Sequence, residues 1–379
     1  MAVLRAVPVP TGAGALSVWP AVEDALSGRG PAMLPTPAED PSAAAGLATA
    51  LRAGEPIDDD VAVVVSTSGT TGTPKGAMLT ASALTASAHA THRRLGGAGR
   101  WLLALPAHHI AGLQVLVRSV LAGTAPVALS ARFSPAELVS AIAGMGAGRR
   151  YAALVAVQLD RALSDPAARR ALADIDAVLI GGGPMPPGLA EKAAAGGISV
   201  VRTYGMSETA GGCVYDGVPL DGVQVRIEDS RIVLGGPTIA KGYRNPVRPD
   251  PFAEPGWFRT DDLGVVDGGV LRVLGRADDA ISTGGLTVLP QLVEAVLGRH
   301  HAIAECAVFG VADERLGQRV VAAVVVRPGA AAPTVAELRS HVAADLEATA
   351  APREVHIVDT LPRRGIGKLD RRALAARFG

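Results

Sequence analysis

Apolar and polar positions over the first part of the chain follow strand-like and helix-like patterns in turn. The run 61–65 is short, apolar and mostly β-branched, as in a buried strand, and residues 81–95 have a helix-forming composition. Further elements are expected as strands at 101–105, 152–157, 177–180 and 198–201, and as a helix at 135–143. Strands and helices that alternate in this way predict an α/β domain, in which helices cover the faces of a sheet.

The pattern changes twice further along the chain. From about residue 212, short strand candidates at 223–227, 231–234 and 270–274 are separated by Gly, Pro and Asp, which predicts a small β-rich subdomain. Strands and helices then alternate again, with strands expected at 304–311, 320–326 and 354–357 and helices at 291–297 and 334–346. We therefore expect a large N-terminal α/β domain of sheets covered by helices (1–276, including the β-rich subdomain at about 212–276) and a small, mobile α+β C-terminal domain (277–379).

Composition and charge narrow the classes of function. The chain has 379 residues, of which 49% are hydrophobic and 19% charged, with 36 basic and 36 acidic residues, as in a globular enzyme. Because there is no basic surplus and only 3% of the residues are aromatic, nucleic acid is not an expected partner. The N-terminal segment contains prolines where a signal peptide is apolar, and the uncharged run between Arg100 and Arg118 is shorter than a membrane span. We expect a cytoplasmic protein that does not contact membranes.

A polar loop follows the strand predicted at 61–65. Residues 66–76 read Ser-Thr-Ser-Gly-Thr-Thr-Gly-Thr-Pro-Lys-Gly. A loop of this kind presents backbone N–H groups and hydroxyls to anionic oxygens, and Lys75 adds a mobile positive charge, so the segment predicts a polyphosphate site. It is not a Walker A loop, because Pro74 stands where that motif requires glycine and Gly76 where it requires Ser or Thr.

Four further segments make this loop part of a larger set. They are Gly181-Gly182-Gly183-Pro184-Met185, residues 203–209 (Thr-Tyr-Gly-Met-Ser-Glu-Thr), residues 257–264 with 275–279, and residues 361–368. In this order the five segments, covering 61–379, resemble the adenylate-forming superfamily of acyl-CoA ligases, nonribosomal adenylation domains and luciferases. The resemblance implies an ATP-dependent ligase that joins a carboxylic acid to CoA through an acyl-adenylate. ATP and CoA would be co-substrates and Mg²⁺ the cofactor.

The resemblance also implies roles for the matched residues. Lys368, Lys75 and Glu208 would be the catalytic residues, with Glu208 holding Mg²⁺, a hard cation that binds one or two carboxylates together with substrate phosphates. Lys368 would reach the α-phosphate, where charge develops in the transition state. Tyr204 would offer a flat face to adenine and Asp262 would accept both ribose hydroxyls. The expected ATP-binding set is Thr67, Ser68, Gly69, Thr70, Thr71, Gly72, Lys75, Gly182, Gly183, Tyr204, Ser207, Asp262, Arg276 and Lys368.

The remaining carried-over positions concern the acid, CoA and domain movement. His109, Arg202 and Gly205 are expected to line the substrate pocket. Gly284 and Gly285 would face the CoA channel. Because Lys368 serves adenylation only, the small domain must move between the half-reactions, and Asp278 stands at the position of the family's hinge.

The acid itself is predicted less directly. The short chain and residues 203–217 resemble family members whose acid carries a second carboxylate. Arg202 is our candidate to bind that spectator carboxylate, but a surface arginine or a salt bridge at the edge of the core is an equally good interpretation. His109 also fits plain core packing.

The sequence departs from the family pattern in two places. The phosphate loop begins at residue 66, earlier than in most members, so part of the usual N-terminal subdomain is missing. The family pattern therefore does not assign the residues of the acyl pocket or those at the interface of an expected homodimer. Asp261 replaces the usual glycine before Asp262.

Three other functions have to be weighed. An aryl- or fatty-acyl-CoA ligase would share these motifs, as would a stand-alone adenylation domain that loads a carrier protein. A non-catalytic paralogue would lack the charged set that this chain retains, namely Lys75, Glu208, Asp262, Arg276 and Lys368.

Overall fold

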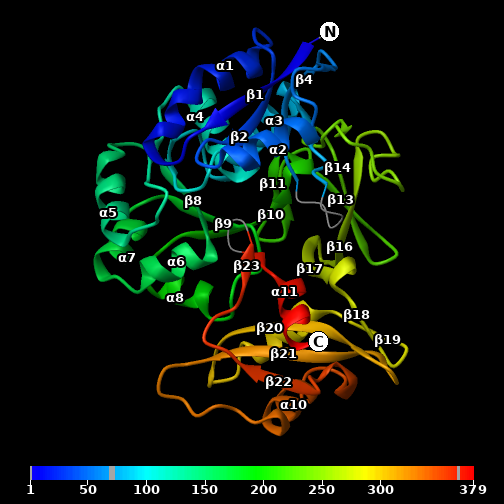
Figure 1. The fold of residues 1–379 in the computed structure, drawn as a ribbon. Helices are drawn as coiled ribbons and strands as arrows, with labels where there is room; N and C mark the ends of the chain where they lie inside the picture. Colours follow the sequence, from blue (N-terminus) through cyan, green and yellow to red (C-terminus); the bar gives the residue numbers. More distant parts are fainter. Residues whose placement is uncertain (1, 68–72, 365–367) are drawn as a thin grey trace.

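Two mixed sheets form the N-terminal part of the protein. The computed structural model describes residues 2–67, 73–364 and 368–379 (Figure 1). The strands of the first sheet are β1 (Ala2–Val9), β2 (Ala32–Pro37), β3 (Pro56–Ile57), β4 (Val61–Val65), β5 (Ala77–Thr80) and β15 (Gly242–Tyr243). Those of the second are β6 (Arg100–Leu103), β7 (Val127–Ala128), β8 (Arg150–Val155), β9 (Ala177–Gly181), β10 (Val200–Met206), β11 (Gly211–Tyr215) and β12 (Val218–Pro219). Their orders are β15-β5-β4-β2-β1-β3 and β12-β11-β10-β9-β8-β6-β7.

Helices separate these sheets and cover the second one. The helices α1 (Trp19–Ser27), α3 (Ala81–Arg94) and α4 (Ile110–Ala122) contact one another and strands of both sheets. On the other face of the second sheet lie α5 (Pro135–Gly144), α6 (Ala156–Leu163), α7 (Pro166–Ala173) and α8 (Leu189–Ala195). The helix α2 (Pro41–Ala50) packs on β2.

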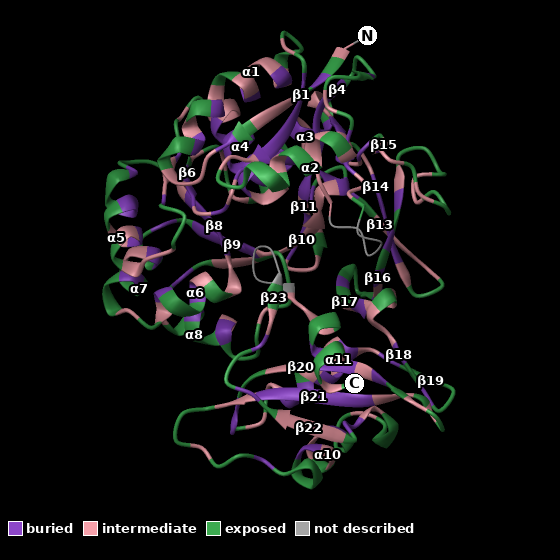
Figure 2. Cartoon of the chain, in the orientation of Figure 1, coloured by how far each residue is buried: buried purple, intermediate pink, exposed green. Residues whose placement is uncertain are grey.

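Both faces of the second sheet are buried, as the apolar runs predict. On β9, Leu179 belongs to the core that contains α3 and α4, whereas Val178 and Ile180 belong to the core formed with α5 to α8. Successive side chains of a strand point to opposite faces, so a strand with helices on both sides has to be apolar throughout. The predicted α/β arrangement is confirmed, and the buried strands at its centre are visible in Figure 2.

Local sequence sets the ends of the central helices. The side chain of Thr80 accepts a hydrogen bond from the backbone N–H of Ala83 and caps α3. Arg93 and Arg94 occupy the last turn of α3, where positive charge complements the helix dipole. Gly123 ends α4 in the left-handed conformation, with φ of 64°.

The predicted β-rich subdomain is an antiparallel sheet of four strands. They are β13 (Gln224–Glu228), β14 (Arg231–Gly235), β16 (Trp257–Asp267) and β17 (Val270–Arg276), in that order across the sheet. The long strand β16 contains the Trp-Phe-Arg-Thr-Asp-Asp motif, a segment for which the apolar pattern predicts no strand.

The C-terminal part has its own sheet and its own core. Its strands are β18 (Ile281–Thr283), β19 (Leu286–Val288), β20 (Ile303–Asp313), β21 (Gly317–Val326) and β22 (Glu354–Ile357). The helices α9 (Pro290–Leu297) and α10 (Val335–Ala343) share one apolar cluster with this sheet, and α11 (Arg371–Phe378) shares a second cluster on the other face. Two short strands, β23 (Arg363–Arg364) and β24 (Lys368–Leu369), pair with each other and project toward the N-terminal part (Figure 1).

No helix in the ranges that the structure describes is both long and apolar enough to span a membrane.

Candidate active site

The predicted adenine and ribose residues meet where β10 approaches β16 and β17. The hydroxyl of Tyr204 donates a 2.7 Å hydrogen bond to Oδ2 of Asp262, which is 58 residues away in the sequence. Asp262 is buried, and Nη1 of Arg276, its partner in the β16–β17 register, lies 3.6 Å from Oδ1. Burial raises the pKa of Asp262, although the Tyr204 hydroxyl and Arg276 act in the opposite direction.

Arg276 also binds the residue predicted as the hinge. Its Nε and Nη2 donate to the two carboxylate oxygens of Asp278, at 2.8 Å each. Burial opposes both charges, but the pair lowers the pKa of Asp278 and, with Asp262, raises the pKa of Arg276. Asp261, which replaces the family's glycine, takes part as well, with Oδ2 3.6 Å from Arg276 and Oδ1 3.2 Å from Arg231. The residues predicted as the ribose contact and as the hinge therefore belong to one ionic cluster.

Ser207 and Glu208 lie on a short turn held from behind by the central helices. The turn is the 3₁₀ segment η2 (Ser207–Thr209), which follows β10 directly. Ala210 comes next, with a φ of 50° that is unfavourable for a residue other than glycine. Its carbonyl accepts hydrogen bonds from Ser87 Oγ on α3 (3.0 Å) and Gln114 Nε2 on α4 (2.8 Å). These two buried bonds stabilise the strained turn that presents Glu208.

The Glu208 carboxylate is buried and bonded to a tyrosine that the motifs did not single out. Tyr243 donates a 2.6 Å hydrogen bond to Oε1 of Glu208. Burial, followed by the charge of Glu208, raises the pKa of Tyr243, so its phenol stays protonated and acts as the donor. In the described part of the chain, no cationic side chain lies within 4.0 Å of Glu208.

This environment fits the predicted Mg²⁺ site. A buried carboxylate without a cation is costly, and a divalent ion would neutralise it. Within the described ranges no three His, Cys, Asp or Glu residues cluster as metal ligands. An ion at Glu208 would be held by this carboxylate together with substrate phosphates.

The end of the phosphate loop packs against β15. Lys75 Nζ lies 5.2 Å from the centre of the Tyr243 ring. Gly76 has a φ of 72°, and a Cβ there would lie 2.6 Å from Cδ2 of Leu51, so glycine is required. Thr67 is the second residue of the loop, and its buried Oγ1 has no hydrogen-bond partner in the described part of the chain. Ser68, Gly69, Thr70, Thr71 and Gly72 lie outside the described residues.

Lys368 belongs to the C-terminal part. Its backbone pairs with Arg364 in the β23–β24 hairpin. The side chain of Lys368 is not among the described groups, so its predicted contact with substrate stays a prediction.

The residues predicted for the acid pocket are less tightly organised. His109 is the N-cap residue of α4, and its ring lies 4.3 Å from that of His108, whose pKa burial lowers. At Gly205, β10 runs so close to β11 that a Cβ would lie 2.7 Å from Cα of Gly212. Arg202 has a side chain that is 63% exposed, and its Nε lies 3.4 Å from Oδ1 of Asp216. The present contact of Arg202 is therefore a salt bridge at the protein surface.

The predicted glycines lie in loops. Gly182 and Gly183 follow β9 and are exposed, and Gly182 has a φ of 83°. Gly284 and Gly285 form the turn between β18 and β19, with φ of 58° and 81°.

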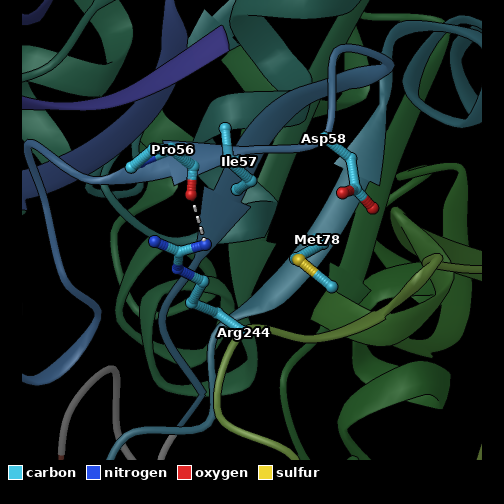
Figure 3. Close-up of a pocket in the computed structure, with 5 residues that line it drawn as sticks. All are labelled: Pro56, Ile57, Asp58, Met78 and Arg244. Atoms are coloured by element: carbon cyan, nitrogen blue, oxygen red, sulfur yellow. Dashed lines mark hydrogen bonds between the residues drawn. The ribbon is translucent and has the colours of Figure 1, made fainter. Parts of the chain in front are cut away.

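Tyr243 is the residue of this candidate site that the sequence motifs did not reveal. A signal was present in the composition, because the chain has only four tyrosines and two of them bond carboxylates of the site. Arg244, next in the chain, points away from the site into a cavity of about 220 Å³ (Figure 3), which is lined by Pro56, Ile57, Asp58, Met78 and Arg244.

The fold and the arrangement of the predicted nucleotide residues indicate a class of protein: an enzyme with a large α/β part, which carries those residues, and a small α+β part that follows it in the chain. Comparison with known proteins agrees. Residues 19–244 match the model of the AMP-binding enzyme family, and residues 292–368 match the AMP-binding enzyme C-terminal domain. The chain belongs to the AMP-binding enzyme family.

Relatives cover nearly the whole chain. It is 64% identical to a protein named "Probable 2-succinylbenzoate--CoA ligase" from Mycobacterium tuberculosis, over 99% of this chain and 98% of that one. A 2-succinylbenzoate–CoA ligase of a Geobacillus species is 37% identical over 83% of this chain and 69% of its own length. Among solved structures, the o-succinylbenzoate CoA synthetase of Bacillus subtilis, in complex with its acyl-adenylate intermediate, matches with a TM-score of 0.72 and 32% identity, covering 85% of this chain and 72% of that one. The predicted fold class and the predicted enzyme class, an AMP-forming acid–thiol ligase, are confirmed.

Proposed function

We propose that this enzyme activates o-succinylbenzoate with ATP and transfers the acyl group to CoA, a step of menaquinone biosynthesis. The observation that carries the reaction is the preformed nucleotide cradle, in which Tyr204, Asp262 and Arg276 are joined across three strands. The choice of acid is supported by the names of the relatives, above all the one that is 64% identical over almost the full length.

In the first half-reaction, a carboxylate oxygen of the acid attacks the α-phosphorus of ATP, and pyrophosphate leaves. Asp262 accepts the ribose hydroxyls and Tyr204 packs on adenine. Lys75 neutralises the leaving phosphates, and Lys368 stabilises the charge that grows at the α-phosphate. Mg²⁺, when bound at Glu208, would supply electrostatic stabilisation of the phosphates.

In the second half-reaction, the CoA thiol attacks the acyl carbon and AMP leaves. Lys368 has no role at this carbon, so we infer that the small domain rotates about Asp278 and that Gly284 and Gly285 then face the CoA channel. The Arg276–Asp278 pair, with two bonds of 2.8 Å, links the ribose contact to that rotation.

Pyrophosphate release tests the proposal. The protein is assayed with ATP and Mg²⁺ against o-succinylbenzoate, benzoate and a medium-chain fatty acid, followed by thioester detection with CoA and with a phosphopantetheinylated carrier protein. We expect o-succinylbenzoate and CoA to give the highest kcat/KM. Faster turnover of benzoate or the fatty acid would reassign the acid, and thioester formation on the carrier alone would reassign the acceptor.

A further inference from the structure

The segment 241–245 crosses the end of the phosphate loop and is fastened to it by backbone bonds. We call residues 241–245 the strap. Its strand β15 pairs antiparallel with β5. Beyond that pairing, Arg244 N donates to Gly76 O (2.8 Å) and Asn245 N donates to Lys75 O (2.9 Å). The strap therefore fixes the backbone of the residue that carries the loop's ammonium group.

The side chains of Arg244 and Asn245 anchor the strap to residues 50–56 and to Pro74. The Arg244 guanidinium donates to the carbonyls of Pro56 (2.9 Å) and Leu51 (3.3 Å), and Figure 3 shows it turned toward Pro56. Asn245 Nδ2 donates to Pro74 O (2.9 Å) and Ala50 O (2.8 Å). All of these bonds end on carbonyl groups of the protein itself, and those of Arg244 are strengthened by its charge. The strap is therefore held in position without a ligand.

On the other side, the strap contacts the turn that carries Glu208 at two points. Ala240, directly before the strap, donates its N–H to the carbonyl of Glu208 at 2.9 Å. Tyr243 donates to the Glu208 carboxylate at 2.6 Å. The ring of Tyr243 lies edge-on to Phe252, with centroids 5.1 Å apart, which restricts its rotation.

We propose that Tyr243 is a positioning residue that holds one oxygen of the Glu208 carboxylate, leaving the second oxygen oriented toward the cation that accompanies ATP, and that holds Lys75 over its ring. This inference rests on the proposed function, because it takes Glu208 as the cation ligand. A carboxylate has two oxygens, so one can keep the tyrosine while the other binds the ion. Partners that orient a metal ligand are commonly worth 10–100-fold in metal affinity.

The strap explains why a tyrosine stands here. A phenylalanine would fill the same space and keep the ring beside Lys75, but it would leave the buried Glu208 oxygen without its donor. Tyr243 thus joins the two groups that must converge on the same phosphates, the ammonium of Lys75 and the carboxylate of Glu208, through one rigid side chain.

The test is the Mg²⁺ dependence of ATP binding, measured by calorimetry without acid or CoA, so that no turnover occurs. In Tyr243→Phe we expect the Mg²⁺ concentration for half-maximal enhancement of ATP binding to rise about 10-fold. ATP affinity without Mg²⁺ should stay native, because the ring beside Lys75 remains.

Two further variants make the result specific. Tyr151→Phe also removes a buried hydroxyl, which bonds the carbonyls of Leu95 (3.1 Å) and Gly97 (3.0 Å) away from the site, and should leave the Mg²⁺ requirement native. Glu208→Gln should raise the Mg²⁺ requirement more than Tyr243→Phe does. If Glu208→Gln raises it and Tyr243→Phe does not, the positioning role of Tyr243 is wrong while the proposed function stands. If neither variant changes it, Glu208 is not the cation ligand, and the inference fails with that assignment.

Discussion

At the predicted ATP end of the site, buried side chains from distant segments bond directly to one another, whereas the predicted acid end consists of one glycine and of side chains that reach solvent. Tyr204 and Asp262 are 58 residues apart, Glu208 and Tyr243 are 35 apart, and both pairs have bonds shorter than 2.8 Å. Arg202, by contrast, is 63% exposed and paired with Asp216.

This difference follows from what each end has to recognise. ATP is the same for every member of such a family, so a rigid site costs no versatility and removes the need to order side chains on binding. The residues predicted to face the acid lie on the interior strand β10 and at the start of α4, and Arg202 is largely exposed, so its substitution should disturb little of the core. The comparison predicts that variants at the ATP end damage catalysis far more than variants at the acid end.

We expect the largest effect from Lys368. We place it at the α-phosphate, where the ATP end and the acid end of the site meet. Lys368→Ala should lower the rate of adenylate formation about 1,000-fold, since a charge aimed at the transition state is lost. Thioester formation from supplied acyl-adenylate should stay near native. The two rates are measured separately by pyrophosphate release and by CoA thioester formation. Equal loss of both, in a variant that remains folded, would remove Lys368 from the adenylation step.

Variants of Asp278 test whether the ionic cluster at the ATP end includes the hinge of the domain rotation. Asp278→Pro fixes φ near −65° and should trap one arrangement of the domains, lowering one half-reaction about 100-fold while the other stays near native. Asp278→Ala is the control, because it breaks the Arg276 pair and keeps backbone freedom. The hinge assignment is wrong if the two variants behave alike in single-turnover assays of each half-reaction.

Asp262 tests whether the ATP end is built for binding at the expense of stability. Burial raises its pKa, so at neutral pH the charged form costs folding free energy, and this cost is relieved as the pH falls through the raised pKa. Asp262→Asn keeps an acceptor for Tyr204 and should weaken ATP binding by about 2 kcal/mol, roughly 30-fold. At pH 7 the thermal unfolding temperature of Asp262→Asn should equal or exceed that of the native protein. As the pH falls, the unfolding temperature of the native protein should rise relative to that of the variant.

A variant that loses both ATP binding and stability would contradict this view. It would mean that the Arg276 pair outweighs the burial of Asp262, and that the ATP end stabilises the fold.

Much of this fold could be predicted because its signals are local. The run 61–65 is apolar at every position and became β4, and alternating elements up to residue 206 gave the helix-covered sheet. The strand β16 was missed as an element because its polar residues, Asp261 and Asp262 among them, hide the alternation of a half-buried strand.

The residues of the candidate site also differ in how far the sequence predicts them. Motif residues such as Tyr204, Glu208 and Asp262 could be found from the sequence, since each belongs to a contiguous segment. Tyr243 could not, because its role depends on the pairing of β15 with β5, more than 160 residues away in the chain. The pair of hydrogen bonds between Arg276 and Asp278 could not be predicted either. It forms because the turn η3 (Ala277–Asp279) brings the carboxylate of Asp278 back to the guanidinium of Arg276.

Arg202 should give the smallest effect, and it tests the acid end directly. Its present partner, Asp216, lies at 3.4 Å on the surface, and such a pair contributes about 1 kcal/mol or less. If the spectator carboxylate of o-succinylbenzoate takes the place of Asp216, Arg202→Ala should lower kcat/KM for this acid about 5-fold and leave ATP affinity unchanged. This is less than a fully buried arginine would show, because solvent already reaches the guanidinium.

Two controls separate recognition of the acid from support of the fold. Asp216→Asn keeps an acceptor for the backbone N–H of Arg202, which donates to Oδ1 at 3.0 Å, but removes the competing charge, so kcat/KM for o-succinylbenzoate should equal or exceed the native value. A monocarboxylate analogue should react poorly with the native enzyme and lose little more in Arg202→Ala, because it has no second carboxylate to bind. If both acids lose the same factor, Arg202 stabilises the pairing of β10 with β11, and the spectator carboxylate is bound by other residues.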